Sequence, residues 1–280
     1  MAESNHPRSV HIIPLGYEID RAIRPFDSEK AVRVYLLTMK QMEKYNTPEE
    51  IQMTARERHY ESRVSDILTE KGIQVIKKQI DMFNTLEVMR EVASIINQEK
   101  EQNSVIKVNM SACGRITAFA TTLAAMAHDV SLYYVRADKY ADSAHDVECH
   151  GLSICKQQRI WNLEKIPLAL PDKMKVTVLS LLAGKKQGLF TWEIVDHLIQ
   201  SGEPGYDIPF REKHKDEMRM IQRRYHTRLN KSALEPLIAS GYVTKKKVGR
   251  YHRITITQSG LYLAAVHGAF IAPEFSEMYP

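Results

Sequence analysis

The chain has few of the features that mark membrane and secreted proteins. No apolar run approaches the roughly 18 residues that cross a bilayer, and 280 residues include only three cysteines, Cys113, Cys149 and Cys155. Residues 1–14 are polar and then strand-like, without the successive charged, apolar and small-residue parts of a secretory signal. These absences predict a cytoplasmic protein that has no disulfide framework and does not bind a membrane.

Three common motifs of enzymes and cofactor sites are also missing. No G-x-G-x-x-G follows the first β-rich run, and the second run ends in Thr38, Met39 and Lys40 without the acidic residue that would bind a ribose. The P-loop G-x-x-x-x-G-K-[ST] and the nucleophile elbow G-x-S-x-G are absent as well. We therefore predict a protein that is not an enzyme of these classes and uses no cofactor.

Positive charge is concentrated in one segment. The whole chain has 39 Lys and Arg against 34 Asp and Glu, a formal net charge of +5. Residues 211–253 alone contain 13 basic and 4 acidic residues, a net charge of +9, so the rest of the chain carries −4. Such asymmetry is typical of a protein that binds a polyanion, although a solvated basic face without a partner gives the same composition.

Strand-like and helical patterns alternate through the first half of the chain. Helical stretches between the strands predict βαβ units, and hence a mostly parallel, Rossmann-like α/β sheet with helices on both faces. In such sheets, ligands bind at the carboxyl ends of the strands where the strand order reverses. The expected strands are residues 9–14, 32–37, 73–80, 104–109 and 130–135, and the clearest helices are 47–71, 84–99 and 115–127.

Two of these strand ends are candidate ligand sites. After the fourth strand, small residues lead directly into a helix, whose free N–H groups and dipole favour an anion such as phosphate. Arg115 adds a charged donor there, although small residues in such a turn also simply permit close packing of strand and helix. The candidate ligand-binding residues are Pro14, Leu15, Gly16, Glu18 and Arg21 after the first strand, and Asn109, Ser111, Ala112, Cys113, Gly114 and Arg115 after the fourth.

A polar stretch separates the two halves and is expected to be a linker. It contains His145, Cys149, His150 and Cys155, which are possible zinc ligands, but their spacing matches no common finger and no C-x-x-C pair is present. We therefore predict no metal site. The predicted organisation is a ligand-sensing and dimerisation domain at 1–140, a linker at 141–170 and a second domain at 171–280.

The second half has the element order of a winged helix-turn-helix domain. Helices are expected at 172–182, 191–200 and 218–239, with Trp192 and Tyr225 in the core and Pro236 kinking or splitting the third helix. A hairpin at 243–257, with Gly249 near its turn, provides the wing. The third helix of such a domain enters the major groove of double-stranded DNA, while the wing contacts the phosphate backbone.

The basic residues lie where this arrangement needs them. The wing lysines are expected to bind phosphates without regard to sequence, and the helix is expected to read bases. A winged helix that contacts only proteins is the alternative. The candidate DNA-binding residues are Arg223, Arg224, Arg228 and Lys231 on the third helix, and Lys245, Lys246, Lys247, Arg250 and Arg253 on the wing.

Several segments together resemble archaeal regulators of the CARF-like type, in which a CRISPR-associated Rossmann fold precedes a winged helix-turn-helix. The resemblance rests on Val10-His-Ile-Ile-Pro-Leu-Gly16-Tyr-Glu-Ile-Asp-Arg21, Val32-Arg-Val-Tyr-Leu36, Val108-Asn-Met-Ser-Ala-Cys-Gly-Arg-Ile116 and Tyr133-Tyr-Val-Arg-Ala-Asp-Lys-Tyr140. It covers most of the chain.

The resemblance implies a homodimeric transcriptional regulator whose two Rossmann sites bind a cyclic oligoadenylate or related nucleotide and shift the winged helices on DNA. Two positions depart from the family pattern, because Cys113 replaces a glycine of the turn and Arg115 replaces the usual lysine. The identity of the ligand therefore stays open. Two alternatives also stay open: an enzyme that cleaves cyclic oligonucleotides, in which Cys113 could have a depressed thiol pKa, and a non-enzymatic scaffold.

Overall fold

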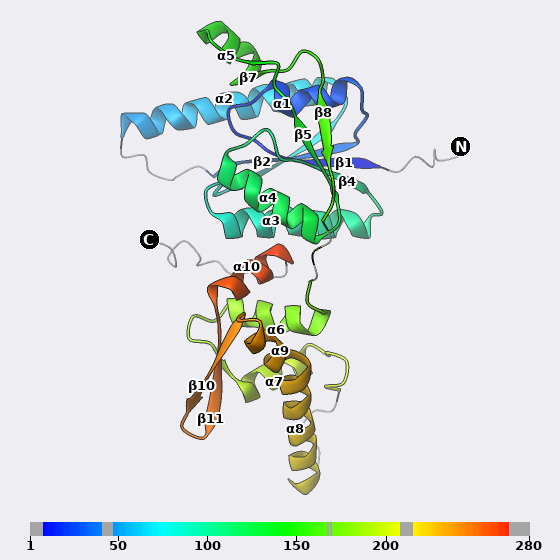
Figure 1. The fold of residues 1–280 in the computed structure, drawn as a ribbon, viewed down its shortest axis with the longest axis vertical. Helices are drawn as coiled ribbons and strands as arrows, with labels where there is room; N and C mark the ends of the chain where they lie inside the picture. The colour runs from blue at the N-terminus through cyan, green and yellow to red at the C-terminus, as the bar shows by residue number, and fades with distance from the viewer. Residues whose placement is uncertain (1–7, 41–46, 167, 169, 208–214, 269–280) are drawn as a thin grey trace, which may run out of the picture. The chain divides into compact units, whose positions relative to one another are not determined.

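The computed structural model describes residues 8–40, 47–166, 168, 170–207 and 215–268 of the chain. The chain divides into two compact units, Met1–Leu168 and Ala169–Pro280, each with its own sheet and helices (Figure 1). In the described ranges, none of the helices has both the length and the apolar composition needed to cross a lipid bilayer.

The first unit is built on a six-stranded sheet in the order β3-β2-β1-β4-β5-β8. Its first five members pair in parallel, and β8 pairs antiparallel with β5 at one edge. The expected mostly parallel, Rossmann-like sheet is therefore confirmed. The strands are β1 (Ser9–Pro14), β2 (Arg33–Met39), β3 (Gln74–Ile80), β4 (Val105–Asn109), β5 (Ser131–Val135) and β8 (Ile160–Leu163).

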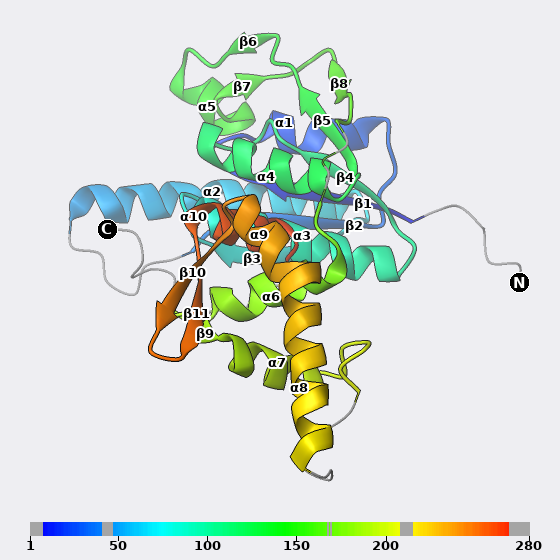
Figure 2. The ribbon, with the colours of Figure 1, turned by 60° about the horizontal axis from the view of Figure 1, so that its bottom comes forward.

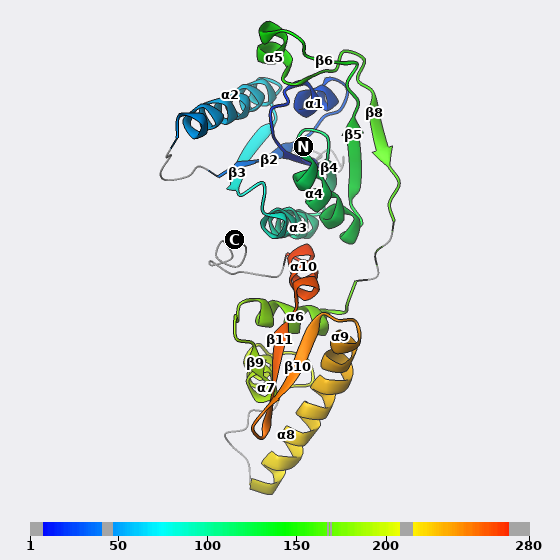
Figure 3. The same cartoon turned by 60° about the vertical axis from the view of Figure 1, so that its left-hand side comes forward.

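Helices cover both faces of this sheet, with α1 and α2 on one face and α3 and α4 on the other (Figure 3). Alternation along β2 explains the two layers, since successive side chains of a strand point to opposite faces. Val34 and Leu36 join the core under α2, whereas the Tyr35 hydroxyl reaches Glu99 of α3. The helices are α1 (Asp20–Ile23), the 3-10 turn η1 (Arg24–Asp27), α2 (Pro48–Glu70), α3 (Thr85–Glu101) and α4 (Arg115–Ala127).

The segment expected to be a linker, 141–170, is mostly part of the first unit, and that prediction is corrected. It contains α5 (Ala144–His150), the strand β7 (Ser153–Ile154), which pairs with β6 (Lys139–Tyr140), and β8 of the main sheet. The Ser153 hydroxyl donates to Glu18 at 2.8 Å, and the Cys155 N–H donates to Asp20 at 2.9 Å. Local hydropathy misses these elements because long-range pairing holds them.

The cysteines and histidines of this segment were the possible zinc ligands of the sequence. Cys149 Sγ lies 3.8 Å from His145 Nε2 on α5, while Cys155 is fully buried and burial raises the pKa of its thiol to about 12. Within the described part of the chain, no group of three or more His, Cys, Asp or Glu side chains is arranged to hold a metal ion.

The second unit is a winged helix domain. Helices α6, α7 and α8 precede the β10–β11 hairpin, and α8 and the hairpin both extend from the helical core of this unit (Figure 2). The predicted wing is confirmed, and a short strand that the sequence did not suggest, β9, completes a three-stranded sheet in the order β10-β11-β9. The elements are α6 (Lys173–Ala183), β9 (Leu189–Phe190), α7 (Thr191–Gln200), α8 (Lys215–Leu229), α9 (Glu235–Ala239), β10 (Val243–Val248), β11 (Tyr251–Ile256) and α10 (Gln258–Val266).

The long third helix is interrupted by a π-helical turn before its proline. A π-helical turn, Asn230–Leu234, joins α8 to α9, and the Glu235 N–H bonds to the Asn230 carbonyl. Pro236 lacks an N–H, so the ordinary helical ladder is interrupted there and the wider turn accommodates the interruption. Tyr225 is fully buried, as expected, but Trp192 is 45% exposed and is therefore not a core residue.

Candidate functional site

The carboxyl ends of β1 and β4 meet at the point where the strand order reverses. The Gly16 N–H donates to the Ala112 carbonyl at 2.7 Å, so the two loops touch through their backbones. A Cβ placed on Gly16 would lie 3.5 Å from the Ala112 oxygen and 3.6 Å from Cys113 Cα. These distances are ordinary van der Waals contacts, so the packing does not by itself require glycine here. The contact between the loops puts the candidate ligand residues at the place where such sheets bind ligands.

A pocket of about 300 Å³ opens beside these loops. It is walled by the end of β2, by the segments that follow β1, β3 and β4, and by further residues from α2, from α4 and from the β7 region. Six of the predicted ligand residues line it: Leu15, Gly16, Glu18, Ala112, Cys113 and Gly114. The remaining lining residues are Tyr17, Thr38, Met39, Met53, Glu57, Met82, Phe83, Thr117 and Leu152.

The other five predicted ligand residues, Pro14, Arg21, Asn109, Ser111 and Arg115, do not line this pocket, and three of them support its loops. The Asn109 side chain donates to the Arg21 carbonyl at 2.9 Å and accepts from the Ser111 N–H and hydroxyl. The Ser111 hydroxyl oxygen in turn accepts from the Val135 N–H at 3.1 Å. Arg21 donates to the Ser111 carbonyl at 3.0 Å, and its guanidinium lies over the Tyr134 ring. Together with Pro14, which is buried at the end of β1, these side chains hold the loops in place.

Two carboxyl groups line the otherwise largely apolar pocket. Burial raises the pKa of Glu18, although one of its oxygens accepts the Ser153 hydroxyl at 2.8 Å. Its other oxygen, Oε2, is buried and has no hydrogen-bond partner among the described residues. Burial also raises the pKa of Glu57. A buried acceptor without a hydrogen-bond partner is costly.

The first turn of α4 lies at the mouth of this region. Gly114 is the N-cap residue and provides no side-chain cap, and the first turn has no acidic residue. Gly114 and Arg115 are exposed, and in the described chain Arg115 has no ion-pair partner. Burial raises the pKa of the Cys113 thiol to about 12, which is opposite in direction to the depressed thiol pKa considered from the sequence.

The second unit carries the predicted basic surface. Arg223, Arg224, Arg228 and Lys231 are exposed on α8 and the π turn, and Lys245, Lys246, Lys247 and Arg250 are exposed on the wing. Arg253 differs, because it is partly buried with its guanidinium carbon 4.6 Å from the centre of the Phe190 ring. Arg228 similarly lies over Tyr206, at 5.7 Å.

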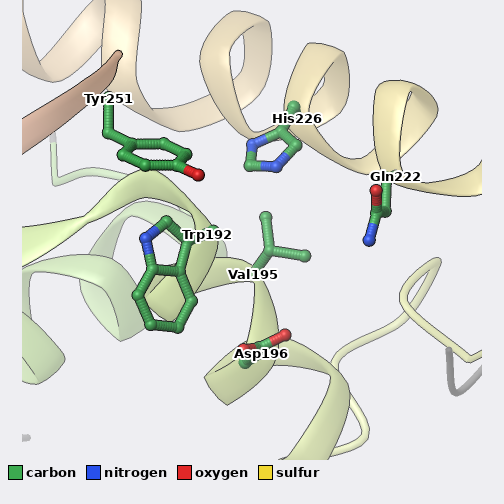
Figure 4. Close-up of a pocket in the computed structure, with 6 residues that line it drawn as sticks. All are labelled: Trp192, Val195, Asp196, Gln222, His226 and Tyr251. Atoms are coloured by element: carbon green, nitrogen blue, oxygen red, sulfur yellow. The ribbon is translucent and has the colours of Figure 1, made fainter. Parts of the chain in front are cut away.

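A second pocket, of about 450 Å³, lies between α7, α8 and β11 within this unit (Figure 4). Its lining residues were not singled out from the sequence as ligands, and Trp192 was assigned to the core. The available signal was the pair Gln222 and His226, which lie one helical turn apart on the polar side of the third helix. The other lining residues are Val195, Asp196 and Tyr251.

The fold defines a protein in which a Rossmann-like α/β domain is followed by a winged helix domain. Comparison with family models agrees with both parts. Residues 9–140 match the model described as "HFX_2341_N:-like, N-terminal", and residues 174–268 match the DUF6293 C-terminal winged helix domain. The two matches agree with the fold, since one covers the N-terminal domain and the other covers the winged helix domain, which is the organisation that the CARF-type resemblance implied.

Three solved structures are similar over most of this chain. Protein VC1899 from Vibrio cholerae is 10% identical, with a TM-score of 0.40, and 92% of this chain and 64% of that one are covered. Can2 from Sulfobacillus thermosulfidooxidans, in complex with cyclic tetra-adenylate, is 14% identical with a TM-score of 0.36 and coverages of 93% and 62%. Csm6 from Enterococcus italicus, bound to cyclic hexa-2'-fluoro-hexa-dAMP, is 14% identical with a TM-score of 0.40 and coverages of 85% and 57%.

The chain spans less than two thirds of the length of each of these three structures. Among curated proteins, none matches the sequence.

Proposed function

We propose that the protein is a dimeric transcriptional regulator that binds double-stranded DNA through its winged helix domain and responds to a nucleotide bound by its N-terminal domain. The observation that carries this proposal is the set of exposed cations on α8 and on the wing. Winged helix domains place these two elements against the major groove and the adjacent phosphates. The whole chain has a net charge of only +5, so the basic surface is local.

Exposure and the lack of acidic partners support a DNA-binding role for the wing. Lys245, Lys246 and Lys247 lie on β10, and among the residues that the structure describes no carboxylate pairs with them. A cation without an internal partner keeps its full charge available for phosphate, and binding then releases condensed counterions from DNA.

The first-unit pocket supports a ligand with both an aromatic and an anionic part. Apolar side chains such as Met53, Met82 and Phe83 would pack on a base, while the carboxyls of Glu18 and Glu57 would accept hydrogen bonds from an exocyclic amino group. Phosphate would lie at the exposed first turn of α4 with Arg115. Adenine has the required amino donor, so a cyclic oligoadenylate, the ligand class implied by the CARF-type resemblance, is the proposed ligand.

An apolar surface on α4 supports the dimer. Ile116 and Phe119 are 52% and 55% exposed and lie one turn apart, directly beside Arg115. A symmetric contact through α4 would cover both side chains and bring two ligand loops together. Light scattering tests this, because I116E/F119E should shift a dimer to a monomer. A wild-type protein that is monomeric at micromolar concentration would contradict this part of the proposal.

The wing lysines provide the experiment that tests DNA binding. The variant K245A/K246A/K247A should bind every duplex on the order of 100-fold more weakly at 0.1 M salt, and its salt slope should fall by about 0.9 for each lysine removed. The charge-matched control K173A/K185A/K186A, also in the second unit, should retain most of the affinity. Fluorescence anisotropy at several salt concentrations gives both quantities, and equal losses in the two variants would contradict the proposed surface.

A further inference from the structure

The pocket between α7, α8 and β11 lies entirely in the winged helix unit (Figure 4). Its volume of about 450 Å³ falls within the range of small-molecule sites. Two aromatic side chains, one carboxylate, one amide and one imidazole meet there. Val195, which also lines the pocket, belongs to the buried core of the domain, whereas these polar and aromatic residues are not among its buried residues.

Aromatic surface forms one end of the pocket. Trp192 and Tyr251 are 45% and 57% exposed, and Figure 4 shows them together at one side, with Gln222 at the other. Phe190 supports both rings from behind, stacked on Trp192 with ring centres 6.4 Å apart and edge-on to Tyr251 at 6.1 Å. Exposed rings that are held in place in this way offer flat faces on which a planar ligand can stack.

The polar groups of the pocket define which hydrogen-bonding groups a matching ligand has. Asp196 on α7 can only accept hydrogen bonds when ionised, so the ligand needs a donor. Burial lowers the pKa of His226, and the nearby Asp196 charge opposes that shift only in part. The imidazole is therefore neutral at pH 7 and offers one donor and one acceptor, as the Gln222 amide also does.

Cations lie on the same face of the sheet as Tyr251. In the β10–β11 ladder, Arg253 is opposite Lys246, and Arg253 is two residues from Tyr251, so all three side chains point to one face. The Arg253 guanidinium lies over Phe190, and its buried Nε has no hydrogen-bond partner among the described residues. This face therefore favours an anionic group next to the aromatic surface.

We propose that this pocket binds a nucleotide whose base carries an exocyclic amino group. The base stacks on Trp192 and Tyr251, its amino group donates to Asp196, and its phosphate lies toward Lys246 and Arg253. A simple organic cation would satisfy Asp196 but would leave the two cations facing a like charge. The site is separate from the first-unit pocket, and the nucleotide can come from two sources: a free mononucleotide, or an unpaired base of bound DNA.

The two tryptophans of the chain allow a local measurement. The chain contains only Trp161 and Trp192, so W161F leaves Trp192 as the single reporter of this pocket in the full-length protein. AMP should quench its fluorescence saturably and at least about tenfold more tightly than IMP, which has an oxygen in place of the amino group. CMP should likewise bind more tightly than UMP. Equal affinities within both pairs overturn the proposal.

Variants in the W161F protein assign each contact. D196N should remove the preference for AMP over IMP, whereas the control E235Q, which changes an exposed carboxyl of α9, should keep it. K246A should weaken the binding of AMP but not that of adenosine, which has no phosphate. Y251A should weaken the binding of AMP and of IMP to the same extent. The comparison of AMP with IMP uses the protein with Asp196 intact. It therefore still decides the proposal if the D196N protein fails to fold.

Oligonucleotides separate the two sources. Quenching by single-stranded dA12 but not dT12, without quenching by AMP, assigns the base to DNA, and quenching by AMP assigns it to the free nucleotide. Absence of quenching by every one of these probes overturns the proposal. Anisotropy of a labelled duplex measures DNA binding independently of Trp192, so a protein that binds duplex DNA but no base would contradict this inference and leave the proposed function standing.

Discussion

The cations of the two units are used in opposite ways. In the first unit, Arg33 pairs with the buried Glu99, Lys107 pairs with Glu29, and Arg21 is buried against Glu18 and the Ser111 carbonyl. In the second unit, Arg223 and Lys245–Lys247 are exposed, and no carboxylate pairs with them in the part of the chain that the structure describes. The same residue types therefore form internal ion pairs at these positions of the first unit and are exposed to solvent at these positions of the second.

The buried pairs of the first unit join distant parts of its sheet. Glu99 on α3 accepts from Arg33 Nη1 at 2.5 Å, from the Tyr35 hydroxyl at 2.7 Å and from the Ser104 hydroxyl at 2.7 Å. Burial alone would raise the pKa of Glu99, but these hydrogen bonds outweigh it and lower that pKa. His11 and Lys107 make a second group with Glu29, in which only His11 is fully buried. These contacts, unlike those of exposed ion pairs, lie where water does not compete fully.

Removal of Glu99 should have the largest effect on the stability of the first unit. A small effect would contradict the stabilising role of the first unit's ion pairs. We expect E99A to lower the free energy of unfolding of the first unit by about 3 kcal/mol, since Arg33 and the Tyr35 and Ser104 hydroxyls lose their acceptor. Urea denaturation in a W192F background measures it, because Trp161 then reports the first unit alone. The control E101A, at an exposed site of the same helix, should change that value by less than about 0.5 kcal/mol.

An exposed arginine of the second unit should show the converse behaviour. We expect R223A to leave the unfolding free energy within about 0.5 kcal/mol of wild type, and to weaken binding to a preferred duplex about tenfold. Competition with a scrambled duplex in an anisotropy assay checks whether discrimination is lost. R63A, which removes an exposed charge from α2, should leave DNA affinity unchanged; a similar loss there would indicate a general charge effect.

The pH dependence of unfolding tests the contribution of Glu29 to the stability of the first unit. Hydrogen bonds from His11 and Lys107 hold the pKa of Glu29 at about 2, below its usual 4.5. A lowered folded-state pKa means that Glu29 contributes stability above pH 4.5 and loses that contribution as the pH falls toward 2. Urea melts of wild type and E29Q should therefore differ more at pH 7 than at pH 3. A difference that did not shrink would contradict the assignment, and E70Q, at an exposed position, should show no pH-dependent difference.

The smallest effect on DNA binding is expected at Arg115. Because this side chain belongs to the first unit, R115A should change the affinity of the unliganded protein for DNA by less than about twofold. Any change in DNA affinity caused by cyclic oligoadenylate should be abolished, since a phosphate contact is lost. Anisotropy with and without the nucleotide separates the two effects. Incubation of the nucleotide with wild type, followed by chromatography, would reveal cleavage if the protein were instead an enzyme.

Much of the architecture was predictable from the residues. Alternating strand and helix patterns predicted the parallel sheet, and the Gly249 turn between basic strands predicted the wing. The 141–170 segment was not predictable, because β8 is a strand only by pairing with β5. The site was half predictable. Spacing placed Gly16 after a strand and Gly114 before a helix, but it could not show that the Ser111 hydroxyl bonds to the Asn109 side chain.

By itself, the sequence determined the local properties of this protein: which segments become strands or helices, and where positive charge accumulates. These follow from periodicity and composition, which act over a few residues. Tertiary structure alone decided which cations are paired and which remain free. It also brought Trp192, Asp196 and Tyr251 to one pocket with His226. Such arrangements depend on contacts between residues far apart in the chain, whose distances no local pattern records.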